Sequence, residues 1–563
     1  MFNFRWIPCV LAALAISGCE GVVTTPAGKA PVPLPIAELP KDACAQIEVA
    51  AGLTSLRRLS TEEQRNSFRD LLADATLTPA LAPVNGPVIT EAEVEKLNLA
   101  VAALVATNKH LTWLPCDPAA AVNLACADTF IATFGQVAFR RPLTAVEKAW
   151  LRTDVFDAIR ARADITPPAT FREAIDAVAQ AILQAPQLLY VHEQGVSDAS
   201  LPAGIRRLTG HERATRLSYL LWKTTPDAKL LAAAADGTLD TAGGVRAQAE
   251  RLLASPRSKQ TVRGFVTSWL ELDGNTHQAS LDATPKSATA FPFDSPSLRT
   301  AMREELVALF DRTFFAPGGS FKDLMTSNKA YVNKSLGTLY GMAAPPANDT
   351  TFAWVDLNPQ QRAGLFTRAG FLALYAPQEQ KSPIRRGVFL FKEALCRPLG
   401  SPPANVNNTP LTLSDQPLTV RQQVEARTGE AACQGCHKSI NPLGFTLEGY
   451  DAIGRYEEIE KGVLSGQPYQ LPINATATPV GTDFDKPVTG AIELSQQLAS
   501  SGMAHDCLAA TWFEQANPQG LTAAGGACSL QRLKARFRQT DDIRDLLLSL
   551  ASDDSALFLQ ESK

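Results

Sequence analysis

Five consecutive residues carry the clearest chemistry in this chain: Cys433, Gln434, Gly435, Cys436 and His437. They have the form C-x-x-C-H, in which two thiols three positions apart can each form a thioether with a haem vinyl group. The imidazole that follows is then placed to bind the iron. The sequence therefore predicts one covalently bound haem c, attached through Cys433 and Cys436, with His437 as the proximal ligand.

A disulfide or a metal–thiolate site is the alternative interpretation of the two cysteines. A thioredoxin-like dithiol needs a strand-to-helix setting inside a β-α-β pattern, and no such alternation precedes Cys433. The chain also lacks the G-x-S-x-G, H-E-x-x-H and P-loop patterns. Hydrolase chemistry of those kinds is therefore not predicted.

The second axial ligand would decide what a haem iron can do in this chain. A Met or a second His suits electron transfer, whereas an open position can bind peroxide, oxygen or a substrate. Met503 and His505 are the best candidates, because they follow the motif at a distance usual in small cytochromes and lie just before Cys507. The other Met and His residues are expected in packing or hydrogen-bonding roles: Met302, Met325, Met342, His110, His192, His211 and His277. Three arginines are possible partners for haem propionates, although a solvated helix face is their default role: Arg421, Arg427 and Arg455.

The N-terminus has the form of an export signal. Arg5 precedes an apolar stretch over residues 6–16 that is too short to span a membrane. Ile16-Ser17-Gly18-Cys19 resembles a bacterial lipoprotein cleavage box. These features predict a signal peptide over residues 1–18 and a lipid on Cys19. An ordinary secretory signal or a short anchor is the alternative. Glu20, where an Asp often retains lipoproteins in the inner membrane, favours the outer membrane.

Residues 19–43 are expected to form a tether, because residues 21–40 within them are rich in Pro, Ala, Thr and Val and nearly free of charge. No later segment has 18 uninterrupted apolar residues, so the lipid is the expected membrane attachment, on the periplasmic or surface-facing side. A net charge of −4 gives no reason to expect nucleic acid as a partner. The expected partner is a redox protein or a small oxidant, which the sequence does not identify.

Six further cysteines suit an oxidising compartment: Cys44, Cys116, Cys126, Cys396, Cys507 and Cys528. Several connectivities are possible. Short loops favour Cys116–Cys126 and Cys507–Cys528, which leaves Cys44 to pair with Cys396.

The elements that must position these residues are expected to be helices. Four capping boxes predict helix starts, at Ser60–Glu63, Thr144–Glu147, Thr170–Glu173 and Thr209–Glu212. A capping residue followed by Pro predicts three more, at Ser295, Asn358 and Ser382. Residues 467–488 are expected to form a loop with a short hairpin. The predicted fold class is mainly α: a multi-domain helical protein with a C-terminal cytochrome c-like unit and a short β hairpin.

Pro-rich breaks near 276–295, 343–350 and 398–418 suggest several domains. The predicted units after the tether are an N-terminal helical domain (44–165), a central helical domain (166–345), a helical connector (346–430) and the domain with the haem motif (431–563).

Several segments outside the motif are distinctive in combination: Ala138–Thr144, Ala181–Pro186, Arg216–Trp222, Ser382–Gly387 and Asn441–Phe445. Together they resemble the planctomycete-cytochrome-type secreted proteins, which are strings of domains of unknown function. The resemblance extends from about Leu56 to the C-terminus. It implies export and one C-x-x-C-H motif per chain, but no established reaction. Relatives often carry Met and Asp where this chain has Ile440 and Asn441. If that Met is a ligand or packs against the haem in the relatives, this chain lacks it.

Three functions therefore stay open. The first is a monohaem c-type cytochrome, tethered to the outer membrane, that passes electrons. The second is a peroxidase- or oxygenase-like haem enzyme acting on an extracellular substrate. The third is a helical binding or scaffold lipoprotein. The long helical region before the motif exceeds what an electron carrier needs and favours the second and third.

Overall fold

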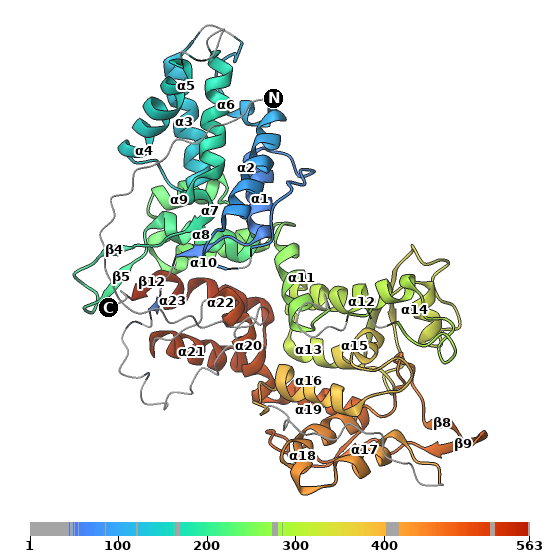
Figure 1. Ribbon diagram of the computed structural model, residues 1–563. Coiled ribbons are helices and arrows are strands. Elements are labelled where there is room, and N and C mark those ends of the chain that lie inside the picture. Colours follow the sequence, from blue (N-terminus) through green and yellow to red (C-terminus); the bar gives the residue numbers. More distant parts are fainter. Residues whose placement is uncertain are drawn as a thin grey trace, which may run out of the picture. The chain divides into compact units, whose positions relative to one another are not determined.

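The computed structural model describes residues 56–560, except 85, 120–121, 163, 165–168, 273–279, 284, 401–415 and 518–523, and also residues 44, 49 and 51–53. The predicted signal peptide, the lipidation site Cys19, the tether and His277 lie outside the described residues. Within the described part, helices dominate (Figure 1) and the predicted mainly-α class is confirmed. None of the helices there combines the length and apolar composition needed to cross a membrane.

The first helical group packs around one hydrophobic cluster that extends from Phe68 to Leu189. Its helices are α1 Thr61–Leu71, α2 Glu91–Ala106, α3 Leu124–Phe139, α4 Ala145–Ala149, α5 Ala158–Arg160, α6 Phe171–Gln184 and α7 Pro186–Leu189, with the short turns η2 Lys109–Trp113 and η3 Trp150–Asp157. The cluster continues past residue 165, where a domain boundary was expected, because α6 buries Ile175, Val178 and Ile182 against it.

A second, larger cluster extends from Ala214 to Leu557. Its first helices are α8 Gly210–Trp222, α9 Ala228–Ala235, η4 Thr238–Asp240, α10 Ala242–Leu253, α11 Ser258–Trp269, α12 Pro296–Phe315, α13 Phe321–Thr326, α14 Lys334–Leu339, η5 Leu365–Thr367 and α15 Ala369–Leu374. The later helices are α16 Pro383–Phe389, η6 Leu390–Ala394, α17 Val420–Thr428, α18 Ala431–Phe445, α19 Gly490–Ser500, α20 Gly502–Ala516, α21 Ala524–Thr540, α22 Ile543–Ser552 and α23 Asp554–Leu557. Residues from the last helices thus complete the core that α8–α12 begin.

Strands are short. One sheet has the order β1-β12-β5-β4, in which β12 (Phe558–Gln560) pairs parallel with β1 (Gly52–Leu53) and antiparallel with β5 (Ile205–Arg207), and β4 is Val196–Ser197. The remaining pairs are β2 (Arg57–Arg58) with β3 (Tyr190–Val191), β6 (Lys329–Val332) with β7 (Ala353–Asp356), β8 (Ile459–Leu464) with β9 (Gln467–Pro472), and β10 (Thr476–Ala477) with β11 (Val488–Thr489). The segment 467–488, predicted as a loop with a short hairpin, contains β9 and almost all of the antiparallel pair β10–β11. The longer hairpin β8–β9 begins before this segment, at Ile459.

Local capping chemistry decides where most of the predicted helices begin. At Ser60, Thr144, Thr170 and Thr209, the hydroxyl accepts from the amide three residues on, and the Glu there accepts from the cap amide. Ser295 and Ser382 also cap helices as predicted. The helix predicted at Asn358 is wrong, because the Asn358 side chain accepts from the Gln360 amide and closes a turn instead.

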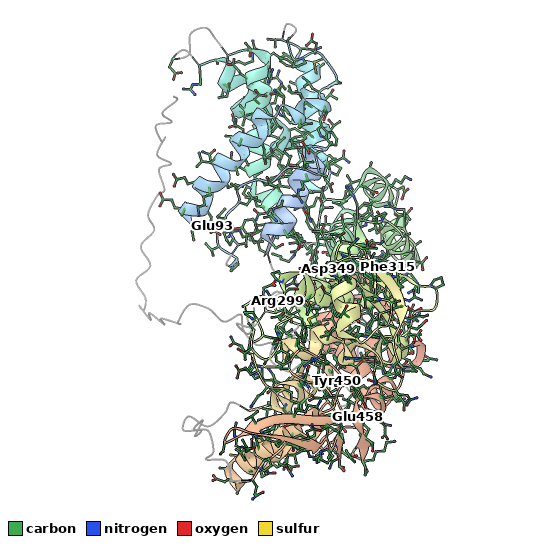
Figure 2. All side chains as sticks on the ribbon, turned by 90° about the vertical axis from the view of Figure 1, so that its right-hand side faces the viewer. Glu93, Arg299, Phe315, Asp349, Tyr450 and Glu458 are labelled. Atoms are coloured by element: carbon green, nitrogen blue, oxygen red, sulfur yellow. A yellow bond between two sulfur atoms is a disulfide. The ribbon has the colours of Figure 1, made fainter. Side chains whose placement is uncertain are left out.

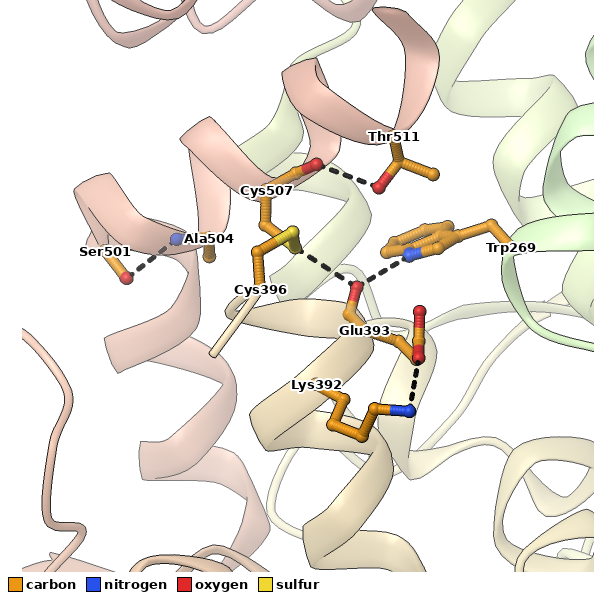
Figure 3. Close-up of a disulfide and its surroundings, with 8 residues drawn as sticks. All are labelled: Trp269, Lys392, Glu393, Cys396, Ser501, Ala504, Cys507 and Thr511. Atoms are coloured by element: carbon orange, nitrogen blue, oxygen red, sulfur yellow. Dashed lines mark hydrogen bonds and ion pairs between the residues drawn. A yellow bond between two sulfur atoms is a disulfide. The ribbon is translucent and has the colours of Figure 1, made fainter. Parts of the chain in front are cut away.

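The disulfides are Cys44–Cys528, Cys116–Cys126 and Cys396–Cys507. The predicted Cys116–Cys126 bond is present. The predicted Cys507–Cys528 pair is wrong, and so is Cys44–Cys396. Cys507 lies on the side of α20 that packs against η6, where its sulfur is 3.4 Å from the Glu393 carbonyl oxygen and bonds to Cys396 (Figure 3). Cys507 lies on α20 and Cys528 lies on α21. Neighbouring helices can direct such cysteines to different faces, so the short separation of the two residues in the sequence did not decide their pairing.

Candidate functional site

The motif lies on α18, and two glycines set the close packing of α18 against α16. A Cβ atom added at Gly387 would lie 2.2 Å from the Ile440 carbonyl oxygen, and one at Gly444 would lie 1.9 Å from the Pro383 carbonyl oxygen. Both distances are far below van der Waals contact, so only glycine permits this approach. The backbones of the two helices therefore meet at the second half of α18, beyond His437.

Arg386 on α16 fixes the chain that leaves α18. The residue is 1 % exposed, and its guanidinium donates to four carbonyl oxygens, those of Leu372, Leu447, Tyr450 and Asp451, at 2.7–3.1 Å. Tyr450 is labelled in Figure 2. Burial lowers the pKa of Arg386 to about 10, so the group stays charged at neutral pH. It acts as a clamp on the turn after α18.

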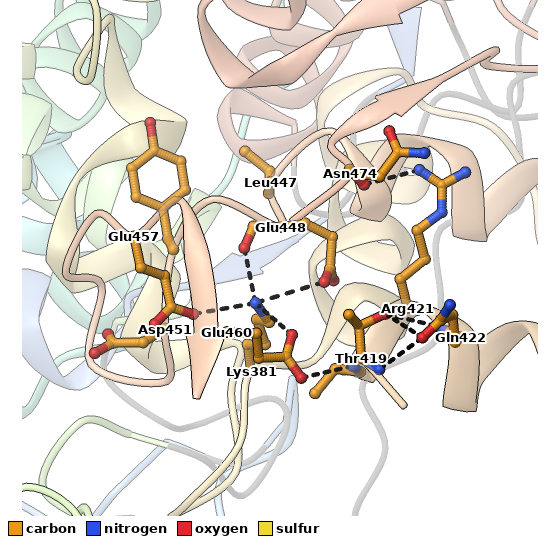
Figure 4. Close-up of polar contacts among 12 residues, drawn as sticks. Lys381, Thr419, Arg421, Gln422, Leu447, Glu448, Asp451, Glu457, Glu460 and Asn474 are labelled. Carbon is orange, nitrogen blue, oxygen red and sulfur yellow. Dashed lines mark hydrogen bonds and ion pairs between the residues drawn. The ribbon is translucent and has the colours of Figure 1, made fainter. Parts of the chain in front are cut away.

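Lys381 forms a second buried attachment next to this clamp (Figure 4). Its ammonium donates to the Glu448 carbonyl oxygen at 2.9 Å and lies 3.1 Å from Glu457 and 2.9 Å from Glu460. Glu460 in turn accepts from the Val420 amide at the start of α17, at 2.8 Å. Lys381 thus links the turn after α18, the hairpin strand β8 and, through Glu460, the helix before α18.

One ammonium, that of Lys381, faces three carboxylates. This imbalance and the burial of the cluster shift the pKa values of Lys381 and Glu448. Burial would lower the pKa of Lys381, but the nearby carboxylates outweigh it and raise that pKa. The Glu448 carboxylate is the most distant of the three, at 3.6 Å. Burial, only partly offset by the Lys381 charge, raises the pKa of Glu448 to about 7. Glu448 therefore holds its proton more readily than an ordinary glutamate does.

The motif residues themselves lie on the first half of α18. Cys433 and Cys436 are half-buried and form no disulfide. In an α-helix, positions i, i+3 and i+4 fall within an arc of roughly 100°, so both thiols and the His437 ring share one face. The Nδ1 atom of His437 is 3.0 Å from Oδ1 of Asn441. Two free thiols and one imidazole on a single face fit two thioethers and a proximal ligand.

The part of the chain that the structure describes contains no group of three His, Cys, Asp or Glu side chains placed to hold a metal ion.

His505, a predicted distal ligand, is engaged through both ring nitrogens. Nδ1 is 2.8 Å from the Ser501 carbonyl oxygen, and Nε2 is 2.8 Å from the Asp541 carboxylate. The ring also packs between Phe321 and Phe537. With no ring nitrogen left to bind iron, this arrangement argues against the predicted role and explains the residue as part of the core between α20 and α21.

Met503, the other predicted distal ligand, packs its side chain against the large hydrophobic cluster. Its amide donates to Asp483 at 3.0 Å. The helix α20 that carries it packs on α11, α21, α22 and η6, whereas α18 packs on α16, α17, η6 and β10. Met302 and Met325 are core residues, as expected for Met302.

Three of the remaining candidates, His110, Arg421 and Arg455, have structural partners of their own. His110 is buried and bonds to Asp176 at 2.7 Å, and His192 is exposed. Burial lowers the pKa of His211. Arg421 pairs with Glu425 and lies over the Phe445 ring, and Arg455 pairs with Asp451. Arg427 is exposed.

Three residues of the site were not identified from sequence: Lys381, Arg386 and Asn441 in its hydrogen-bonding role. The sequence did offer a signal for Asn441. It stands four positions after His437, which is the spacing of side-chain neighbours on a helix. The sequence singled out Ser382–Gly387, which contains Arg386, but gave no role to Arg386 or Lys381, because most of their partners are backbone carbonyls and carboxylates about 60 to 80 residues away.

Three family models match the chain, and each is described as a protein of unknown function. PSD5 (DUF1595) matches residues 126–193, PSD4 (DUF1592) matches 208–342 and PSCyt3 (DUF1588) matches 362–460. Together they cover more than half of the 563 residues. The chain belongs to the planctomycete-cytochrome-type proteins. In this planctomycete-cytochrome-type chain, the PSCyt3 match contains α16, α17 and α18. No curated protein and no solved structure matches it.

Proposed function

We propose that this protein is a monohaem c-type cytochrome that transfers electrons while a lipid on Cys19 holds it at the outer membrane. The observation that carries the proposal is the state of the motif on α18. Two unpaired thiols stand beside an imidazole whose Nε2 has no hydrogen-bond partner within the described residues. The name of the PSCyt3 family model, which matches this segment, hints at a cytochrome-like domain.

In this proposal Cys433 and Cys436 would hold the haem and His437 would bind its iron. A bound haem c supplies one-electron oxidation and reduction. The half-buried position of both cysteines leaves this face of α18 within reach of a partner. The glycine contacts and the Arg386 clamp hold the other half of α18 still. The chain therefore presents its reactive face from a fixed support.

Covalent attachment is the decisive test. The full chain, expressed in a periplasm with haem-maturation machinery, should keep its haem after acid–acetone extraction. Cys433→Ala plus Cys436→Ala should abolish this retention. The matched control is Cys116→Ala plus Cys126→Ala, which removes a disulfide in the N-terminal helical group and should leave retention intact. A wild-type chain without covalent haem in that host would refute the proposal.

A second function is favoured by the surroundings of the predicted distal ligands. His505 has no free ring nitrogen and the Met503 side chain packs on the core. A haem iron without a distal protein ligand could bind a small oxidant, as a peroxidase- or oxygenase-like enzyme requires. Carbon monoxide distinguishes the two functions. A ferrous protein that stays low-spin and ignores the gas is an electron carrier, whereas rapid binding favours the enzyme.

A further inference from the structure

A chain of three hydrogen bonds connects α17 to the His437 ring. The Thr428 hydroxyl donates to the Val424 carbonyl oxygen at 2.8 Å. The Asn441 amide nitrogen donates to the Thr428 oxygen at 2.9 Å. The Asn441 oxygen is 3.0 Å from Nδ1 of His437. Asn441 is 6 % exposed, so these contacts are shielded from competing water.

The order of donors and acceptors in this chain fixes the protonation of the imidazole. A hydroxyl has one proton, and Thr428 gives it to Val424, so Thr428 can only accept from Asn441. The Asn441 amide must therefore turn its NH2 group to Thr428 and its oxygen to His437. An amide oxygen cannot donate, and so the proton of the bond must sit on Nδ1. The lone pair of the neutral ring is then on Nε2.

We propose that Asn441 is a positioning residue for His437, holding the ring in the Nδ1–H tautomer with Nε2 available as an iron ligand. A metal-binding His is commonly oriented by an acceptor on its other nitrogen, and that acceptor also raises the electron donation of the ring. Here the acceptor comes from the same helix, four residues on, and its own orientation is fixed from α17. The ligand role rests on the proposed function; the tautomer does not.

The tautomer can be tested without haem. The full chain with Cys433→Ala and Cys436→Ala, labelled with 15N-histidine, gives the His437 ring signals by NMR above the pH of imidazole protonation, with His437→Gln for assignment. The Nδ1–H form should exceed the other by about tenfold, as one shielded hydrogen bond allows. Asn441→Ala should remove this excess, and Asn441→Asp, which keeps an acceptor oxygen, should restore it. Ser439→Ala, on the same helix, is the matched control and should change nothing.

The haem-loaded protein provides the second measurement. A carboxylate acceptor makes the imidazole a stronger donor, so Asn441→Asp should lower the reduction potential and Asn441→Leu should raise it. The expected change in the oxidised-to-reduced ratio is about tenfold in each direction, or about 59 mV for one electron. Thr428→Val should move the potential in the direction of Asn441→Leu, by less.

The outcomes separate the two proposals. Equal tautomer populations in the parent and in Asn441→Ala would overturn the inference, as would potentials that do not move when Asn441 is replaced. If the tautomer depends on Asn441 but the wild type takes up no haem, the proposed function fails while the orientation of His437 by Asn441 stands. A poorly folded Asn441→Ala leaves Asn441→Asp and Thr428→Val to decide through the potential.

Discussion

The two halves of α18 have opposite environments. The first half carries Cys433, Cys436 and His437, is half-buried, and has one side-chain hydrogen bond to its histidine. The second half, from Ile440 to Phe445, is mostly buried and meets α16 backbone to backbone at Gly387 and Gly444. Reactivity and rigidity are thus placed on consecutive turns of one helix.

This division has a physical reason. A thiol that must react and an imidazole that must bind a metal need an accessible sulfur or nitrogen atom that makes no other bond. Buried polar groups, in contrast, must be fully paired to be tolerated. Around the turn that follows the second half, Arg386 and Lys381 meet that requirement, because together they bond five backbone carbonyl oxygens and three carboxylates. The first half needs no such pairing, so its residues are free for chemistry.

The largest effect is expected where the buried turn after α18 loses its clamp. Arg386→Met keeps the apolar stem but removes the charged donor from four carbonyl oxygens. The free energy of unfolding should fall by about 3–5 kcal/mol, the usual cost of breaking a buried charged network. Urea titration followed by circular dichroism measures this loss.

Arg385→Met is the matched control for that change, because Arg385 is the preceding residue and is exposed. It should alter the free energy of unfolding by no more than about 0.5 kcal/mol. Equal urea midpoints for the two variants would mean that the clamp contributes no stability, and the contrast between the two halves of α18 would lose its basis.

A smaller effect follows from Glu448, which titrates in the buried turn after α18. Its pKa is raised to about 7 by burial, so the folded state binds a proton that the unfolded state releases near the ordinary value. Its stabilising contribution is complete below pH 4.5 and is lost as the pH rises through 7. The unfolding free energy of the wild type minus that of Glu448→Gln should therefore fall by on the order of 3 kcal/mol as the pH rises across this window.

Urea titrations of both proteins at several pH values between 5 and 8 would measure this change. Taking the difference removes the contribution of other titrating groups, including Glu457, whose pKa is also raised by burial. A difference that stays constant with pH would show that Glu448 keeps its ordinary proton affinity despite the burial around Lys381.

Sequence predicted what depends on neighbours a few positions away. The capping boxes at Ser60, Thr144, Thr170 and Thr209 need a hydroxyl and a Glu three residues on, and all four were correct. Asn358 failed at the same range, because an Asn before Pro can close a turn as well as cap a helix. The motif itself was visible because its three residues share one helix turn.

Long-range partners could not be predicted. Cys528 pairs with Cys44, 484 residues away, and nothing in either neighbourhood indicates it. His505 looked like a free imidazole until the fold brought Asp541 to its Nε2. Asn441 lies at helical spacing from His437, yet its orientation depends on Thr428, which belongs to another helix. Whether a polar group is available for chemistry is decided by these contacts.

The smallest effect on stability is expected in the reactive half. In a haem-free chain with Cys433→Ala and Cys436→Ala, His437→Ala should reduce the free energy of unfolding by about 1 kcal/mol or less, since it breaks one hydrogen bond of a half-buried ring. The same substitution at His505 removes two hydrogen bonds and two aromatic contacts from the core. It should cost about 3 kcal/mol. Urea titration of both variants would compare an imidazole that is available for binding with one that stabilises the fold. A larger loss of unfolding free energy for His437→Ala than for His505→Ala would assign the first half of α18 a structural role.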